Sequence, residues 1–242
     1  MAGGVAVSEG PVQIKRFYET VTVEAGDNAF VIALDGHQAK TQTSKPLAAS
    51  TLPLAQAVAN EWGAQGEFIE RKSMPLTAIL SAAIDCGADD SAQWCQDMLD
   101  YLGSDLVSYR AEAPKALVES QSVAWDPYIY FLRSEFDAAL VMTTGVMAVS
   151  QSDATIASVR RALEGQSAET LFALRTATAI TGSAVLSLAL WKNYREASDV
   201  FDASRIDERF QEERWGEDEE ARLREENMRD EFLTVGQFLS LI

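Results

Sequence analysis

The chain has 242 residues, of which 47% are hydrophobic and 24% charged, so it is long and apolar enough to build a globular core. Its 37 acidic and 20 basic residues give a formal net charge of -17, which argues against nucleic acid and anionic membranes as partners because both would repel the protein. Cys86 and Cys95 lack the close spacing of a zinc or redox site, and we expect them to be reduced thiols.

Residues 1–12 are predicted to be a flexible leader. They show neither the basic and apolar pattern of a secretory signal nor the Arg-rich pattern of a transit peptide. The most apolar segment, 176–190, is shorter than the about 20 residues of a membrane-spanning helix, and no membrane insertion is expected.

Residues 13–78 are predicted to form a small α/β domain. Residues 16–43 alternate as antiparallel strands do, and the Asp35-Gly36 pair is typical of a hairpin turn. Ser50 or Thr51 then caps a helix that can cover one face of the sheet.

Residues 79–242 are predicted to form a larger helical domain, an orthogonal bundle, which makes the fold class α+β. After Pro75 the apolar residues recur with helical spacing. Residues 140–149 are β-branched and ambiguous, and a buried extended segment is one interpretation. The run 177–191 is apolar or small on every side and is predicted to be the core helix of the bundle. Further helices are predicted to start near Ser91, Pro114, Pro127, Ser152, Ser167 and Ser198.

The segment 205–231 departs furthest from an ordinary domain, with twelve acidic and six basic residues in twenty-seven positions. In a helix that ends at Gly216, Glu208, Gln211 and Trp215 lie on one side. Two interpretations remain open. Another helix of the same chain covers Trp215 and the charges face solvent, or this surface binds a partner.

The opposite side of the same helix carries Ile206 and Phe210, which can face the core, with Glu213 close beside them. If Glu213 is buried there, it is either paired with a core-facing arginine such as Arg175 or a functional acid.

Residue chemistry gives no sign of an enzyme. His37 is the only histidine, so a triad with a histidine base elsewhere and a multi-histidine metal site are both excluded. No glycine-rich nucleotide motif follows a strand, and no cofactor is expected. The many acidic residues leave one enzymatic alternative open, a carboxylate- or metal-dependent hydrolase.

Short strings in a consistent order carry a resemblance to a known family. These strings are Lys15-Arg16-Phe17-Tyr18, Leu34-Asp35-Gly36 with Lys40-Thr41, Glu61-Trp62 with Gln65, Met74-Pro75-Leu76-Thr77, Ile84-Asp85, Asp105-Leu106 with Tyr109-Arg110, Gln121, Trp125-Asp126-Pro127, and Asp207-Glu208 with Gln211 and Trp215-Gly216. As an ordered set they resemble the assembly chaperones of mitochondria and alpha-proteobacteria that bind the alpha subunit of the ATP synthase catalytic head.

This resemblance implies a chaperone with no enzymatic activity, which holds the unassembled alpha subunit without ATP until the beta subunit replaces it. It also implies that an acidic residue of the E-x-x-Q-x-x-x-W-G helix is important. The matching positions are Glu208, Gln211 and Trp215, with Asp207 and Glu213 as neighbouring candidates for partner binding.

One position departs from the family pattern, because His37 follows Leu-Asp-Gly where members often have arginine. A role for a fixed charge at that turn is therefore in doubt. We expect a monomer in the bacterial cytoplasm, and the resemblance places organellar relatives in the mitochondrial matrix.

Overall fold

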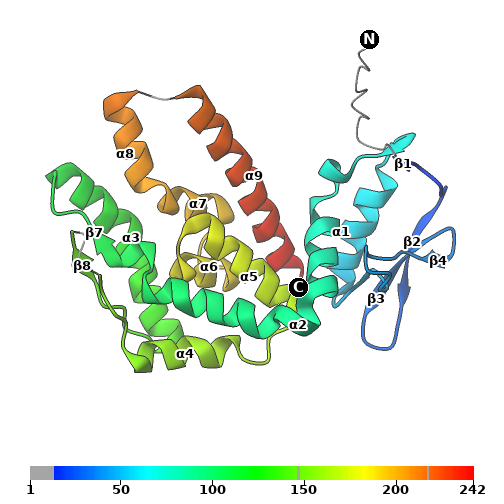
Figure 1. The fold of residues 1–242 in the computed structure, drawn as a ribbon, viewed down its shortest axis with the longest axis horizontal. Coiled ribbons are helices and arrows are strands. Elements are labelled where there is room, and N and C mark those ends of the chain that lie inside the picture. The colour runs from blue at the N-terminus through cyan, green and yellow to red at the C-terminus, as the bar shows by residue number, and fades with distance from the viewer. Residues whose placement is uncertain (1–13, 146–147, 217) are drawn as a thin grey trace, which may run out of the picture.

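The structure is a computed structural model that describes residues 14–145, 148–216 and 218–242. It shows a small unit of short strands and one helix beside a larger group of helices (Figure 1), which confirms the predicted α+β class. The predicted leader, residues 1–12, lies outside the described residues. Within the described ranges, none of the helices is long and apolar enough to cross a bilayer.

The central sheet is antiparallel and begins with two hairpins. Strand β2 (Val21–Ala25) pairs with β3 (Phe30–Leu34), which turns back into β4 (His37–Gln38). The turn residues Asp35 and Gly36 have φ of 49° and 75°, the left-handed conformation that an Asp-Gly hairpin requires. The predicted hairpin is therefore confirmed.

Two further strand pairings complete this unit. Strand β5 (Ala48–Ala49) pairs with β3, while β1 (Ile14–Lys15) pairs with β6 (Phe68–Ile69) in a separate two-stranded sheet. A short 3-10 helix, η1 (Arg71–Ser73), leads into the helical part.

Helix α1 (Leu52–Gly63) covers one face of the central sheet. The hydroxyl of Thr51 accepts a hydrogen bond from the Leu54 amide at 3.3 Å, so Thr51 is the N-cap. Leu54 and Val58, four residues apart on one side of α1, are fully buried toward the sheet.

Helix α2 (Pro75–Gly103) is one continuous helix of 29 residues. The predicted second start at Ser91 was wrong, because the Ser91 hydroxyl donates to the Gly87 carbonyl 2.5 Å away inside the helix. The helix also runs without a break through the predicted boundary between residues 78 and 79. That division of the chain into two domains stays a prediction.

Helix α3 (Lys115–Phe136) contains Pro127, where a new helix was predicted. The core holds the helix across the proline, because Trp125 and Tyr128 on either side of it are both buried. The Trp125 indole also donates to the Ala203 carbonyl at 2.6 Å. Tertiary packing therefore overrides the helix-breaking tendency of proline here.

Short segments connect α2, α3 and the helices that follow. They are η2 (Leu106–Ser108), β7 (Tyr109–Arg110) and β8 (Thr143–Thr144), the last two paired in parallel. The ambiguous segment 140–149 is thus extended at β8, but Val141 and Met142 are exposed. Residues 146–147 of that segment lie outside the described residues.

The predicted core helix 177–191 is two helices. Helix α5 (Ala168–Thr181) ends at Gly182, whose φ of 68° stops it, and the hydroxyl of Ser183 caps α6 (Ala184–Trp191). Residues 184–190 are all buried, so the predicted central position is confirmed although the helix is broken.

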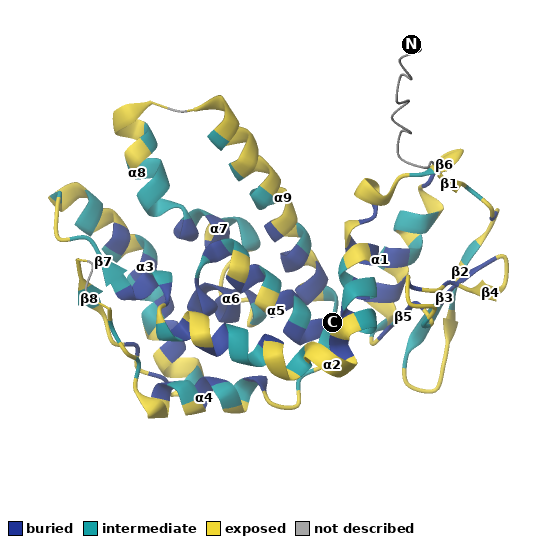
Figure 2. Ribbon diagram, viewed as in Figure 1, coloured by how far each residue is buried: buried dark blue, intermediate teal, exposed yellow. Residues whose placement is uncertain are grey.

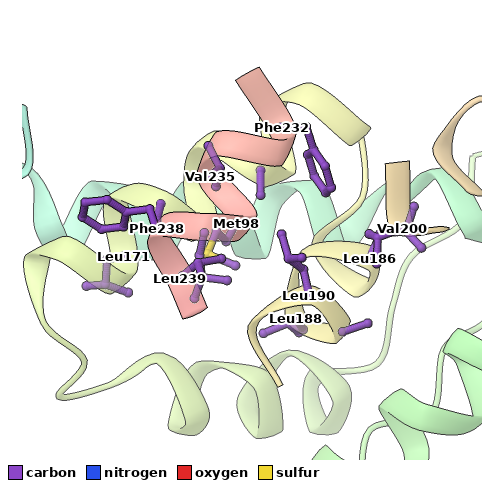
Figure 3. Packing of buried hydrophobic residues seen from close by; sticks show 14 of the residues in the cluster. Met98, Leu171, Leu186, Leu188, Leu190, Val200, Phe232, Val235, Phe238 and Leu239 are labelled. Carbon is purple, nitrogen blue, oxygen red and sulfur yellow. The ribbon is translucent and has the colours of Figure 1, made fainter. Parts of the chain in front are cut away.

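The remaining helices complete the helical part of the molecule. They are α4 (Asp153–Leu163), capped by Ser152 as predicted, and α7 (Ala197–Ser204), α8 (Ile206–Trp215) and α9 (Glu219–Leu241). Figure 3 shows Phe232, Val235 and Leu239 of α9 packed beside Met98 of α2 and Leu190 of α6. These apolar contacts hold the C-terminal half of α9 against the core.

Polar contacts join the sheet-containing unit to the helices. The Ser50 amide donates to Glu169 Oε1 at 3.1 Å, and the Thr51 hydroxyl donates to the carbonyl of Leu241. Glu61 accepts the Thr77 amide at 2.8 Å and so caps the start of α2. Both units are therefore tied together by buried or half-buried groups.

Candidate partner-binding site

Helices α8 and α9 diverge from the core. Figure 1 shows their neighbouring ends, at Trp215 and Glu219, pointing away from the rest of the molecule. Figure 2 shows that these outer ends are exposed while the other end of α9 is buried. None of the ten residues of α8 is fully buried.

The predicted start of this helix was wrong and its end was right. We predicted that Ser198 caps it, but α7 begins there and the chain turns at Arg205 before α8 starts. Gly216, with φ of 89°, follows the last residue of α8 as predicted.

Asp207 faces α3. The Gln121 side-chain amide donates to Asp207 Oδ1 at 2.7 Å, and Gln121 Oε1 in turn accepts the Ala111 amide at 2.8 Å. Gln121 is itself buried. Ile206, which precedes Asp207 in the chain, packs against the hydrophobic core. The start of α8 is therefore positioned by a hydrogen-bonded chain of side chains.

A cluster of ion pairs ties α8 to α7 and α9. Asp202 Oδ1 accepts from Arg209 at 2.6 Å and from Arg229 at 2.5 Å, and Arg209 also lies 3.5 Å from Glu225. Burial alone would raise the pKa of Asp202, but the hydrogen bonds from Arg209 and Arg229 outweigh burial and lower it. The carboxylate is thus held ionised between three helices.

Glu208, Gln211 and Trp215 lie on one open face of α8, as their spacing predicted. Glu208 pairs with Arg205 at 3.2 Å and keeps 46% of its side chain exposed, and Gln211 is exposed. Trp215 is 86% exposed, so the interpretation that another helix of this chain covers it was wrong for the described residues. The face combines an acid, an amide and a large uncovered aromatic ring.

Glu213 does not occupy the place that was predicted for it. It is exposed, and Arg175, its suggested partner, instead pairs with Asp97 at 3.3 Å. The neighbouring Phe210 is only half-buried and lies under the Arg214 guanidinium at 4.4 Å, so it offers no apolar pocket for a carboxylate.

Sequence analysis gave no site role to Gln121 or Arg209, which fix the position of α8. Gln121 is a polar residue at a core-facing position of α3, and that was the signal available for it. Arg209 could not be distinguished by sequence from the other arginines of an acid-rich segment.

Asp105 is a buried carboxylate that accepts hydrogen bonds from groups of η2, α6 and the residue that caps α6. It accepts from the Ser183 hydroxyl at 2.6 Å, from the Val185 amide at 3.0 Å and from the Val107 amide at 3.2 Å. Burial raises its pKa to about 6 despite these donors. It anchors the start of α6 in the core.

Metal ligands do not converge in the parts of the chain that the structure describes. Within residues 14–145, 148–216 and 218–242, no group of three or more His, Cys, Asp or Glu side chains could hold an ion. His37 is exposed on β4, and its Nδ1 lies 3.0 Å from the Asp35 carbonyl. No described cluster therefore favours the hydrolase alternative.

Comparisons with known proteins give one consistent family. The family model described as ATP12 chaperone protein matches residues 15–133. Atp12 from Paracoccus denitrificans is 35% identical with a TM-score of 0.91, over 94% of this chain and 98% of its own. An aspartate-to-lysine mutant of Atp12p from P. denitrificans is 34% identical with a TM-score of 0.91, over 94% of this chain and 97% of its own. The mitochondrial protein atp12 of Schizosaccharomyces pombe is 22% identical over 219 residues, which are 86% of this chain and 75% of that relative. The chain therefore belongs to the ATP12 chaperone family.

Proposed function

We propose that this protein is an ATP-independent assembly chaperone that binds the unassembled alpha subunit of the ATP synthase catalytic head. It shields an interface of that subunit until the beta subunit replaces it. Membership of the ATP12 chaperone family supports a role in ATP synthase assembly, and the open face of α8 supports binding through Glu208, Gln211 and Trp215. The protein acts as a monomer in the bacterial cytoplasm and catalyses no reaction.

The exposed Trp215 is the observation that carries this proposal. A tryptophan with 86% of its surface in solvent has no structural role, and tryptophan is enriched among residues that dominate binding energy at protein interfaces. A subunit made for a ring exposes apolar interfaces that self-associate before their true neighbours arrive. Covering such a surface with Trp215 prevents that association.

The charge of this surface explains how binding of the alpha subunit remains temporary. The acidic groups around Trp215 favour basic surfaces of a client and speed the encounter, but surface charge pairs add little affinity. The beta subunit forms the more stable final interface, so mass action displaces the chaperone and no ATP hydrolysis is needed.

The test is light scattering of isolated alpha subunit during dilution from denaturant, with and without this protein, in the absence of nucleotide. The native protein is expected to suppress aggregation, and Glu208→Lys is expected to lose most of that protection. The matched control is Glu135→Lys, an exposed acid at the end of α3, which should protect as well as the native protein.

Circular dichroism of both variants separates loss of function from loss of fold. Because Glu208 is half-exposed, its charge reversal should leave the thermal midpoint nearly unchanged. In the P. denitrificans relative an aspartate-to-lysine change leaves the fold intact, since mutant and unmutated structures match this chain equally well. Full protection by Glu208→Lys would remove Glu208 from the mechanism.

A further inference from the structure

A second surface lies on the sheet-containing unit, at the opposite end of the molecule from α8 (Figure 1). A groove of about 450 Å³ opens there between β1, β6, η1 and the first turns of α2. Its apolar lining includes Ile14, Phe17, Trp62, Ile69 and Met74. A neighbouring hollow of about 520 Å³ shares Phe17, Lys40 and Trp62 with it, so Phe17 stands between the two.

Phe17 has no structural role that explains its position. Its neighbours do: Arg16 donates to the Gln65 carbonyl at 2.5 Å, and the Tyr18 hydroxyl donates to the Trp62 carbonyl at 2.7 Å. Phe17 touches the edge of the Tyr18 ring but remains 68% exposed. An aromatic ring exposed at the mouth of an apolar groove is typical of a protein-binding surface.

The groove also differs in charge from the rest of the molecule. Residues 14–74 hold six basic and seven acidic residues, whereas residues 75–242 hold fourteen and twenty-nine. The net negative charge of the protein therefore resides almost entirely in residues 75–242, and the sheet-containing unit is close to neutral.

Two cations line the groove without a carboxylate partner. Among the described residues neither Lys40 nor Arg71 takes part in an ion pair, although both face this groove. The acid that lines it, Asp85, already accepts from the hydroxyls of Thr41 and Thr43. The two unpaired cations are therefore available to an anionic group from outside.

We propose that this groove binds an extended segment of a partner protein in which a large apolar side chain stands next to a carboxylate. The apolar side chain packs between Phe17 and Trp62, and the carboxylate is answered by Lys40 or Arg71. The proposal does not depend on the identity of the client of α8, because the two surfaces share no residue. A failure at one surface leaves the other untouched.

The test is fluorescence anisotropy of two labelled peptides with the full chain. One has the sequence Gly-Ser-Leu-Phe-Glu-Glu-Ser-Gly, and the other carries lysines in place of both glutamates. Non-specific attraction to a protein of charge -17 would favour the lysine peptide. The proposal predicts the reverse, with the glutamate peptide binding at least fivefold more tightly, which corresponds to about one charge pair.

Two variants locate the binding in the groove. Phe17→Ser should weaken both peptides about tenfold, and Arg71→Glu should weaken the glutamate peptide about fivefold and abolish the preference. The controls are Tyr130→Ser, another exposed aromatic on α3, and Lys115→Glu, an exposed cation on the same helix. Neither control should change the affinity of either peptide.

Three results would overturn the proposal. They are tighter binding of the lysine peptide, no binding of either peptide at millimolar concentration, and equal losses in the α3 controls. A dimer in sedimentation that Phe17→Ser converts to a monomer would also overturn it, because the groove would then be an interface between copies of this chain.

Discussion

At the scale of single residues, we expect a change at Trp215 to weaken partner binding without lowering the stability of the fold. Its ring is 86% exposed, so Trp215→Ala should change the free energy of unfolding by less than about 0.5 kcal/mol. The same change should weaken binding of the alpha subunit at least tenfold, because it removes the largest apolar group of the open face. Urea titration and surface plasmon resonance measure the two effects. Tyr130→Ala is the control for loss of an exposed aromatic, and equal binding by Trp215→Ala would contradict this role.

Asp105 gives a prediction of pH dependence. Burial raises the pKa of its carboxyl from 3.8 to about 6, so the folded state binds this proton more tightly than the unfolded state. Its contribution to stability is therefore full below about pH 4 and is lost as the pH rises through about 6. Asp105→Asn cannot titrate at this position.

The stability of the native protein relative to Asp105→Asn should therefore fall by about 2 to 3 kcal/mol between pH 4 and pH 7. Urea unfolding of both proteins at several pH values measures this difference. The pH-dependent contributions of the other carboxylates are common to both proteins and cancel in the comparison. A difference that stays constant over this range would show that hydrogen bonds from Ser183 and Val185 fully offset the burial of the charge.

Single residues also show how far sequence reasoning reaches. Helical spacing alone placed Glu208, Gln211 and Trp215 on one side of the helix, but it did not decide whether another helix covers Trp215. The exposure of Glu213 could not be read from spacing, because the angle at which α8 leaves the core depends on Gln121, eighty-six positions from Asp207 in sequence. Contacts of that sequence separation leave no local pattern to read.

At the scale of elements, the crossing of α2 and α5 depends on Gly87. A Cβ at this position would lie 2.4 Å from the Cβ of Ala168, closer than two carbon atoms can approach. Gly87→Ala should therefore force the helices apart and lower the free energy of unfolding by about 1 to 3 kcal/mol.

Gly63 is the matched control for this change. It is the last residue of α1, and a Cβ there would meet no atom within 4 Å. Gly63→Ala should be neutral or stabilise the protein by up to about 1 kcal/mol. Thermal unfolding of both variants makes the comparison, and equal behaviour would contradict a close helix crossing.

The orientation of α8 depends on the Asp202 cluster. Asp202→Asn weakens the charge-assisted hydrogen bonds from Arg209 and Arg229 and should let α8 move relative to α9. Amide hydrogen exchange is expected to become faster in residues 206–215 while the core helix α6 stays protected. The control is Asp126→Asn, which weakens the ion pair between Asp126 of α3 and Arg110 of β7. Unchanged exchange in α8 of the Asp202→Asn variant would contradict the role of the cluster.

Helix boundaries were predictable where a side chain caps the backbone and were missed where packing decides. Thr51 and Ser152 each cap a helix as expected from sequence. Ser91 and Pro127 looked like helix starts, yet both lie inside long helices. The Ser91 hydroxyl bonds back to the Gly87 carbonyl, and Trp125 and Tyr128 on either side of Pro127 are buried. At Gly182 the opposite error occurred. Composition predicted one continuous helix, but the left-handed conformation of Gly182 divides it into α5 and α6.

At the scale of the whole molecule, two surfaces of different chemistry lie at opposite ends (Figure 1). The acidic end carries Trp215 on α8, and the near-neutral end carries Phe17 beside Lys40 and Arg71, which form no ion pair with any residue that the structure describes. The order of sheet unit and helical part followed from the change of periodicity near Pro75. The charge difference between residues 14–74 and 75–242 is already present in the sequence, whereas only the fold brings Lys40 and Arg71 to one groove.

The central claim is that this protein holds the alpha subunit and yields it to the beta subunit. The most direct measurement is a pull-down of the tagged protein from its native lysate, followed by identification of the bound chain and by addition of purified beta subunit without nucleotide. The account predicts that the alpha subunit is captured and that the beta subunit releases it in proportion to its concentration. Absence of the alpha subunit from the captured material, or its retention in the presence of excess beta subunit, would contradict the account.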